Sequence, residues 1–203
     1  AIASGTGFVG SVGDCGMTGP STRLDQGGTF DADAAVAVDL RCGSVALGTG
    51  TGSDWQVSAD YQGPPPTISA DGDGLTVDAA SGGARHDGLT VTVPADRLGS
   101  LDVTTNAATG SLQLDGAALG LIEVDANAGD IAIDAGSATV ERLDVSINAG
   151  RLRIALGTGS TRGEISVNAG AIDIRIANTA ASLSTCGSRC TCRNAGAPDT
   201  SFW

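Results

Sequence analysis

The sequence predicts an all-β fold: a β-solenoid, or parallel β-helix-like stack of coils of about 20 residues each, preceded by a less regular N-terminal β region. Three observations predict it. Thr, Val and Ile are frequent, and the 31 glycines are spread along all 203 residues, as many short strands joined by tight turns require. Apolar and polar residues alternate with a period of two in many segments. A motif around an Asn-Ala pair also recurs at a nearly constant interval.

The N-terminal half divides into two parts. Residues 1–28 are Gly-rich and weakly patterned. From residue 29 strand-like segments follow one another, because apolar residues alternate in 36–42, in 75–77 and in 89–93. Residues 43–47 also resemble residues 110–114 of the regular region. The triple proline at 64–66 predicts a loop, and the Asp73-Gly74 pair predicts a turn.

The regular coils occupy residues 101–174, within one solenoid-like domain spanning 29–174. Their motif is aligned on asparagines that are 21, 21 and 20 residues apart. Apolar positions alternate on both sides of each Asn-Ala-Gly corner, so each coil offers two short strands that meet there. One coil cannot bury its own apolar side, whereas stacked coils bury it in columns of equivalent residues about 4.8 Å apart. The residues predicted to face the interior are Leu101, Val103, Leu112, Leu114, Ile122, Val124, Ile131, Ile133, Leu143, Val145, Leu152, Ile154, Ile165, Val167, Ile172 and Ile174.

The corner residues have a physical reason of their own. Gly, and to a lesser degree Asn, accept left-handed backbone angles that other residues resist. Asparagine side chains repeated at one position of a stack can also hydrogen-bond from coil to coil. We therefore expect a structural asparagine ladder of Asn106, Asn127, Asn148 and Asn168, with a scaffold role rather than a role in ligand contact.

Residues 175–203 break the pattern and end in Phe202-Trp203. A solenoid end exposes unpaired strand edges and needs a cover. This Cys-rich segment is expected to be a cap held by a disulfide or, equally, a docking tail or a disordered tail.

The five cysteines indicate an oxidising compartment, the cell envelope or the extracellular space, where disulfides persist. Their odd number leaves at least one thiol unpaired in a monomer. Cys15 with Cys42 is the first expected pair, and the pairing among Cys186, Cys190 and Cys192 stays open. A metal site is the rival interpretation of the last three, but no histidine accompanies them.

The charge excludes several partners. The formal net charge is -12, and an acidic surface repels nucleic acid and anionic membranes. No apolar run approaches the roughly 18 residues that a membrane-spanning helix needs. Cations and basic partners remain compatible with this composition.

The segments LTVTVP (89–94) and LDV (101–103), followed by the repeated Asn-Ala-Gly corners, resemble the bacterial "putative adhesin" domains of the toastrack-like β-solenoid type. The resemblance covers about residues 36–175, and its motifs are shared by many β-solenoids. It implies a cell-surface or envelope-stress protein of a largely uncharacterised family, for which no catalytic residues can be carried over. The Cys-rich C-terminal segment departs from the pattern, since strands usually continue to the end in this family.

No catalytic motif stands in a context that would support it. Residues 5–10 form a literal GxGxxG, but the strand before it and the helix after it are missing. There is no P-loop, no GxSxG and no HExxH motif. His86 is the only histidine, and its Gly-rich surroundings predict a solvated loop. Residues 71–74 (Asp-Gly-Asp-Gly) resemble part of a calcium loop but lack its other ligands, so we expect no cofactor, with weak calcium binding as the alternative.

An acidic residue stands four positions before each aligned asparagine, and the alternation predicts that these acids face outward in register. Two such charges about 4.8 Å apart repel by roughly 1 kcal/mol in water, unless a bound cation, a neighbouring arginine or a basic partner offsets the repulsion. The column is either a screened solvent face or a surface for a cation or a basic partner. Its residues are Asp102, Glu123, Asp144 and Glu164, with Asp125 on the same face.

These observations favour a secreted or cell-surface, non-catalytic module of adhesin type that binds an unknown ligand through its solenoid faces. The alternative is a structural subunit that self-associates into extracellular filaments or sheaths by end-to-end stacking of coils. A carbohydrate-active enzyme ranks last, because aromatic residues to line a sugar-binding groove are scarce.

Overall fold

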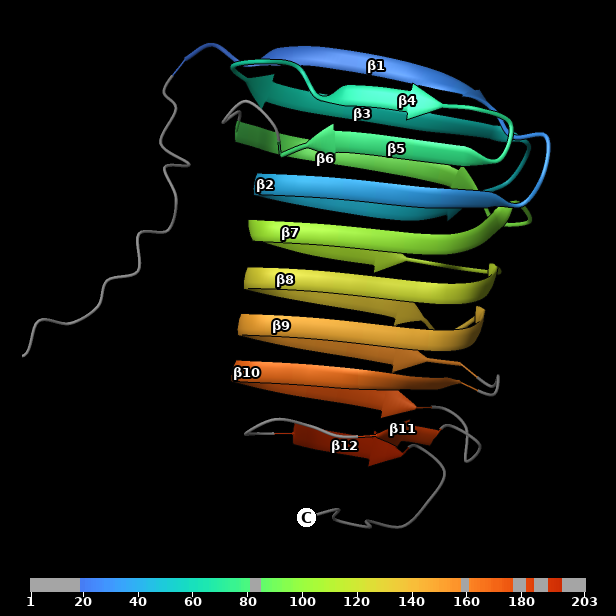
Figure 1. Ribbon diagram of the computed structural model, residues 1–203, viewed down its shortest axis with the longest axis vertical. Helices are drawn as coiled ribbons and strands as arrows, with labels where there is room; N and C mark the ends of the chain where they lie inside the picture. Colours follow the sequence, from blue (N-terminus) through green and yellow to red (C-terminus); the bar gives the residue numbers. More distant parts are fainter. Residues whose placement is uncertain (1–18, 81–84, 158–160, 177–181, 185–189, 195–203) are drawn as a thin grey trace, which may run out of the picture.

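A computed structural model describes residues 19–80, 85–157, 161–176, 182–184 and 190–194. These residues form strands and connections and contain no helix, so the all-β prediction is confirmed. Figure 1 shows the strands stacked across the long axis of the molecule. The strands are β1 Thr22–Thr29, β2 Ala34–Gly50, β3 Asp54–Gln62, β4 Thr67–Ala70, β5 Gly74–Ala79, β6 Arg85–Pro94, β7 Leu98–Gln113, β8 Ala118–Ala135, β9 Thr139–Leu156, β10 Arg162–Ile176, β11 Ser182–Ser184 and β12 Cys190–Asn194.

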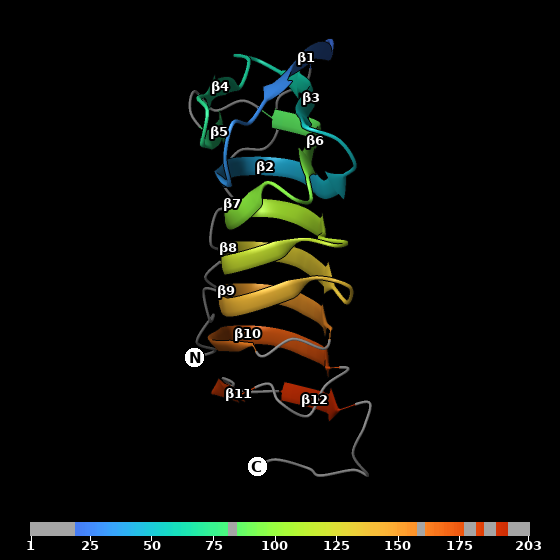
Figure 2. The same ribbon diagram turned by 90° about the vertical axis from the view of Figure 1, so that its right-hand side faces the viewer.

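Each of the strands β7 to β10 forms most of one coil. The strand bends at its corner, so its first arm (before the corner) and its second arm (after it) lie in two facing layers (Figure 2). Consecutive coils pair in parallel along both arms, with corner glycine above corner glycine from Gly129 to Gly150 to Gly170. This is the predicted solenoid.

The N-terminal part is stacked in a different order from the chain. Strand β2 pairs in parallel with β7 along both arms. On the other side of β2, β5 pairs with its first arm and β6 with its second arm, so β5 and β6 together form one coil. Strands β4 and β3 then pair antiparallel with β5 and β6, and β1 pairs antiparallel with β3. Antiparallel strands therefore cover the N-terminal end of the stack (Figure 1).

Strands extend beyond the predicted domain boundaries at both ends. Residues 22–28 belong to strand β1 rather than to an unpatterned segment. At the other end, β11 pairs in parallel with the first arm of β10 and β12 with its second arm. Cys190 and Cys192 stand in register with the buried Ile172 and Ile174, so the chain begins one more coil where a cap or tail was expected.

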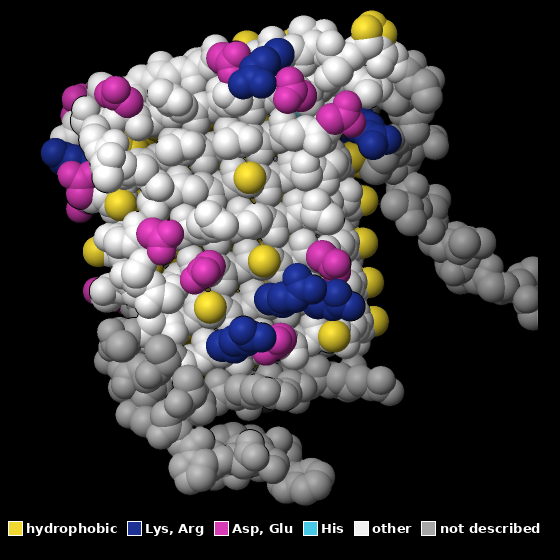
Figure 3. Space-filling model, turned by 180° about the vertical axis from the view of Figure 1, so that it is seen from behind, with side chains coloured by type: hydrophobic (Ala, Val, Ile, Leu, Met, Phe, Trp, Pro, Cys, Tyr) yellow, Lys and Arg dark blue, Asp and Glu magenta, His cyan; other side chains and the backbone are white. Residues whose placement is uncertain are grey.

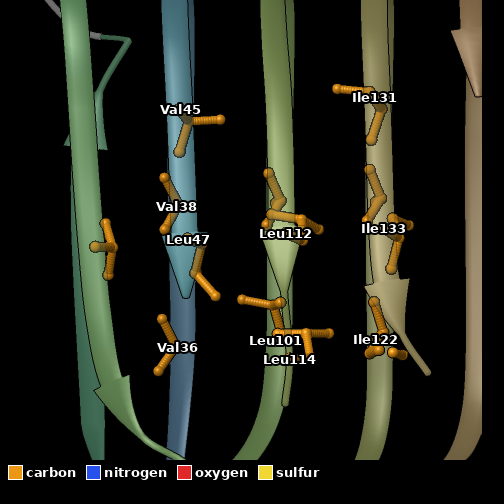
Figure 4. Packing of buried hydrophobic residues seen from close by; sticks show 14 of the residues in the cluster. Val36, Val38, Val45, Leu47, Leu101, Leu112, Leu114, Ile122, Ile131 and Ile133 are labelled. Atoms are coloured by element: carbon orange, nitrogen blue, oxygen red, sulfur yellow. The ribbon is translucent and has the colours of Figure 1, made fainter. Parts of the chain in front are cut away.

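The core lies between the two arms and is almost entirely aliphatic. All the residues predicted to face the interior of the regular coils are buried. They form columns along the stack, such as Val36, Leu101 and Ile122 in the first arms and Leu47, Leu112 and Ile133 in the second arms (Figure 4). Burying one Leu or Ile side chain contributes about 1.5–3 kcal/mol, so the columns are the main stabilising element of the fold.

No helix among the described residues has the length and apolar character needed to cross a membrane.

Candidate binding surfaces

The candidate functional surfaces are the outer sides of the two arms, because every second residue of each arm points away from the core. We call them the first-arm face and the second-arm face. The corners form a third surface between them, along one edge of the stack (Figure 2).

The corner edge carries the four predicted asparagines in one column. The side-chain Nδ2 of Asn127 donates to Oδ1 of Asn106 at 3.0 Å. Asn148 donates to Asn127 at 2.7 Å, and Asn168 donates to Asn148 at 2.7 Å. The amides are thus engaged with one another from coil to coil, which gives this column a structural role.

Replacing Asn148 by alanine should lower the free energy of unfolding by about 1–2 kcal/mol, because two ladder hydrogen bonds are lost at about 1 kcal/mol each. Asn106→Ala is the matched control, since Asn106 accepts only one bond in the ladder. Urea unfolding of both variants should show about half the loss for Asn106→Ala. Equal losses would contradict an additive ladder.

The first-arm face carries the predicted acidic column in register. Asp102, Glu123, Asp144 and Glu164 stand directly above one another. A second acidic set lies two positions further along the arm. Asp39 pairs with Asp78 in the coil on one side and with Thr104 in the coil on the other, and Thr104 pairs in turn with Asp125. We call Asp39, Asp78, Asp102, Glu123 and Asp125 the acidic face.

The electrostatic environment differs along the first-arm face. Burial raises the pKa of Asp39, with further contributions from the charges of Asp78 and Asp102. Burial also raises the pKa of Asp102, helped by the charge of Asp125. Asp144, by contrast, accepts a hydrogen bond from Arg142 Nε at 2.6 Å in an ion pair. Repulsion is therefore concentrated on the N-terminal coils, while Arg142 neutralises Asp144 further along the stack.

Asp102→Asn should raise the free energy of unfolding by a few tenths to about 1 kcal/mol at low salt, because it removes a charge from a repelling set. Asp144→Asn should leave stability unchanged or lower it slightly, because it breaks the ion pair with Arg142. Thermal unfolding in low and high salt measures both, and the difference should shrink as salt screens the charges. The same stabilisation in both variants would contradict this account.

The second-arm face has a different distribution of charge (Figure 3). Its N-terminal coils present small uncharged residues such as Ala46, Thr90 and Ser111, which pair in register. Its C-terminal coils present Arg151, Arg153 and Arg175, which we call the arginine ridge. The sequence analysis did not find this ridge. Aligning the repeats beyond their corners shows why: the column that contains Arg153 has Ala132 and Asp173 in the neighbouring coils, so arginine does not recur in it.

The prediction that His86 lies in a solvated loop was wrong. His86 is part of β6, its exposed fraction is 0%, and neither ring nitrogen has a hydrogen-bond partner. Its ring lies 6.3 Å from the ring of Tyr61, centre to centre. The Gly-rich surroundings suggested a loop, and alternation would not have corrected this, because a register shift at Asp87 pairs Gly43 with His86 but Val45 with Leu89. Counting by twos from Leu89 therefore assigns the wrong side to His86.

The predicted cysteine pairs and the calcium turn are placed only in part. Cys42 is buried on β2 and is not a free thiol, but its expected partner Cys15 lies outside the described residues, as does Cys186. The Cys15–Cys42 pair thus stays a prediction.

Residues 71–74 form the turn between β4 and β5, closed by a hydrogen bond from Asp71 N to Gly74 O at 3.1 Å. No group of His, Cys, Asp and Glu residues in the described ranges is arranged to hold a metal ion.

Comparison with known proteins adds a likeness of fold. No protein-family model matches the chain, and no curated protein matches it. A putative cell adhesion protein from Clostridium sporogenes superimposes with a TM-score of 0.54 at 8% identity, covering 85% of this chain and 100% of that one. Putative adhesins from Bacteroides fragilis (TM-score 0.36, 14% identity, 85% and 97% covered) and Parabacteroides merdae (0.31, 14%, 85% and 95%) are also similar. The first likeness supports the resemblance seen in the sequence at the level of fold.

Proposed function

We propose that this chain is a non-catalytic binding module of adhesin type, secreted or displayed at the cell surface, and that its acidic face binds a basic macromolecular partner. The observation that carries the proposal is the acidic face itself. Adjacent coils hold like charges on one flat surface. Within the described residues, Asp39, Asp102, Glu123 and Asp125 form no ion pair.

A partner with regularly spaced positive charges would relieve this repulsion. Charges one coil apart repel by roughly 1 kcal/mol in water and by more near a surface of lower dielectric. Binding should therefore stabilise the fold and depend strongly on salt. The charge of the acidic face should also steer the partner and so raise the association rate. The absence of a metal-holding group from the described ranges favours a basic macromolecule over a single cation such as calcium.

The antiparallel cap favours a module over end-to-end stacking of coils. For two solenoids to stack at the N-terminal end, the coil of β5 and β6 would have to expose its strand edges. Those edges pair instead with β4 and β3. Any assembly through this end of the chain must then use a surface other than the coil edges.

Calorimetric titration with poly-L-arginine tests the proposal at about 20 mM and about 500 mM NaCl. The variant Asp102→Asn/Asp125→Asn should bind at least about tenfold more weakly than the unaltered chain at low salt. The matched control Asp54→Asn/Asp96→Asn removes the same charge from exposed residues elsewhere and should bind nearly normally. Equal weakening in both variants, or no binding at low salt, would overturn the proposal. Saturable binding of CaCl₂ would assign the face to a cation instead.

A further inference from the structure

Charge is sorted along the axis of the solenoid. Residues 19–135, which form the strands β1 to β8, contain 17 acidic residues and 4 arginines, a net charge of -13. Residues 136–176, which form β9 and β10, contain 4 acidic residues and 5 arginines, a net charge of +1. The molecule therefore has a strongly acidic N-terminal part and a C-terminal part in which arginine prevails.

Three of the five arginines of the C-terminal part form the arginine ridge on the second-arm face. Arg151 and Arg153 are exposed on one side of β9, two residues apart, and no acidic group described in the structure forms an ion pair with either. Arg175 projects from the same face one coil further on, 3.6 Å from Asp173. The ridge lies on the second arms of β9 and β10, whereas the acidic face lies on the first arms of β2, β7 and β8 and on β5. The two patches therefore occupy opposite sides and different coils of the same chain, since the two arms form facing layers (Figure 2).

We propose that the basic partner of the acidic face is the arginine ridge of a second copy of this chain. The inference rests on the proposed function, since it names the partner of the same surface. Two features favour a second copy. Both patches lie on flat outer sheet faces, and each spans neighbouring coils about 4.8 Å apart, so several arginines of one copy can meet several carboxylates of the other at once.

The geometry also determines the type of assembly. Because the two patches are different surfaces, the contact is heterologous: the acidic face of one copy is used, and its ridge remains free for another. Such contacts continue in an open row of laterally offset solenoids unless the rotation closes a ring. This differs from the end-to-end stacking that the sequence left as an alternative.

Light scattering with size-exclusion chromatography and sedimentation velocity test the inference at about 20 mM and about 500 mM NaCl. The unaltered chain should form a concentration-dependent series of oligomers at low salt, with association at least about tenfold weaker at high salt. Arg153→Glu and Asp102→Arg should each be monomeric. Their equimolar mixture should form 1:1 dimers and nothing larger, because only the unaltered ridge of one variant and the unaltered acidic face of the other remain compatible.

Three outcomes would overturn the inference: a monomeric unaltered chain at low salt, oligomers that persist in Arg153→Glu, or a mixture that stays monomeric. Circular dichroism and thermal unfolding confirm that each variant is folded, and both altered residues are exposed. Binding of poly-L-arginine without self-association would leave the proposed function standing and reject only this partner. Failure of both would reject the acidic face as a binding surface.

Discussion

Replacing Gly150 by alanine is expected to lower the free energy of unfolding by about 3 kcal/mol or more. Gly150 has a φ of +142°, a backbone conformation that side chains with a Cβ rarely adopt. A Cβ atom there would also overlap the carbonyl oxygen of Gly129 in the coil above and lie 2.8 Å from its carbonyl carbon. The neighbouring atoms are backbone, so the overlap can be relieved only by separating the two coils.

Three other glycines separate the two causes. Gly116 has a φ of +71° with nothing near its missing Cβ, so Gly116→Ala measures backbone strain alone, about 1 kcal/mol. At Gly163 a Cβ would overlap the Leu143 carbonyl without a left-handed φ, so Gly163→Ala measures the close approach alone. Gly88 has neither feature and should tolerate alanine. Urea unfolding of the four variants should rank Gly150 first, and a Gly150→Ala loss no larger than that of Gly88→Ala would contradict the close stacking.

Local alternation made much of the fold predictable. A period of two depends only on near neighbours, so the buried residues of the regular coils follow directly from the sequence. Corner chemistry is equally local, because an asparagine repeated at the coil length must stand above its equivalent once the coils stack. Asn127 and Asn148 therefore lie where the repeat predicts.

The position of β2 was not predictable in this way. Its alternating residues suit any neighbouring coil, and nothing local in Val36 or Val38 specifies that β7 lies on one side and β5 on the other. This placement depends on contacts between segments far apart in the chain. The last coil was not predicted for a different reason: Cys190 and Cys192 occupy positions where the earlier coils have isoleucine or leucine.

The candidate surfaces show the same division. The acidic column was predictable because its residues keep a constant distance from the asparagines. The arginine ridge was missed because Arg151, Arg153 and Arg175 occupy different positions in the repeat and form one patch only across neighbouring coils. A binding surface of a solenoid is thus best sought in the two-dimensional array of aligned coils.

His86 should make the protein lose stability in mild acid. Burial lowers the pKa of His86, an effect opposed in part by the charge of Asp87. The unfolded chain binds a proton on this imidazole below about pH 6.5, whereas the folded chain binds it only at lower pH. The free energy of unfolding should therefore fall as pH decreases through that window, by up to about 1.4 kcal/mol per pH unit.

His86→Phe isolates this contribution, since it keeps an aromatic ring beside Tyr61 and removes the titrating group. Between pH 7 and pH 5 the unaltered chain should lose up to about 2 kcal/mol more than the variant in urea unfolding. Asp39 and Asp102 act in the opposite direction, because their raised pKa values favour protonation in the folded state as pH falls further. Parallel losses in the two proteins would show that His86 does not titrate in this range.

The location of His86 specifies which part of the solenoid should respond. The His86 carbonyl lies against the Cα of Gly43, at the junction where β6 pairs with β2 and β3. Protonation places a charge in this junction that the charge of Asp87 offsets only in part, beside the antiparallel cap and on the other side of β2 from the asparagine ladder. Hydrogen exchange at pH 5 should therefore accelerate in β3 and β6 of the unaltered chain but not of His86→Phe, while β8 and β9 stay protected in both. A uniform increase along the stack would mean that acid acts on the whole fold, through its many carboxylates, rather than at this junction.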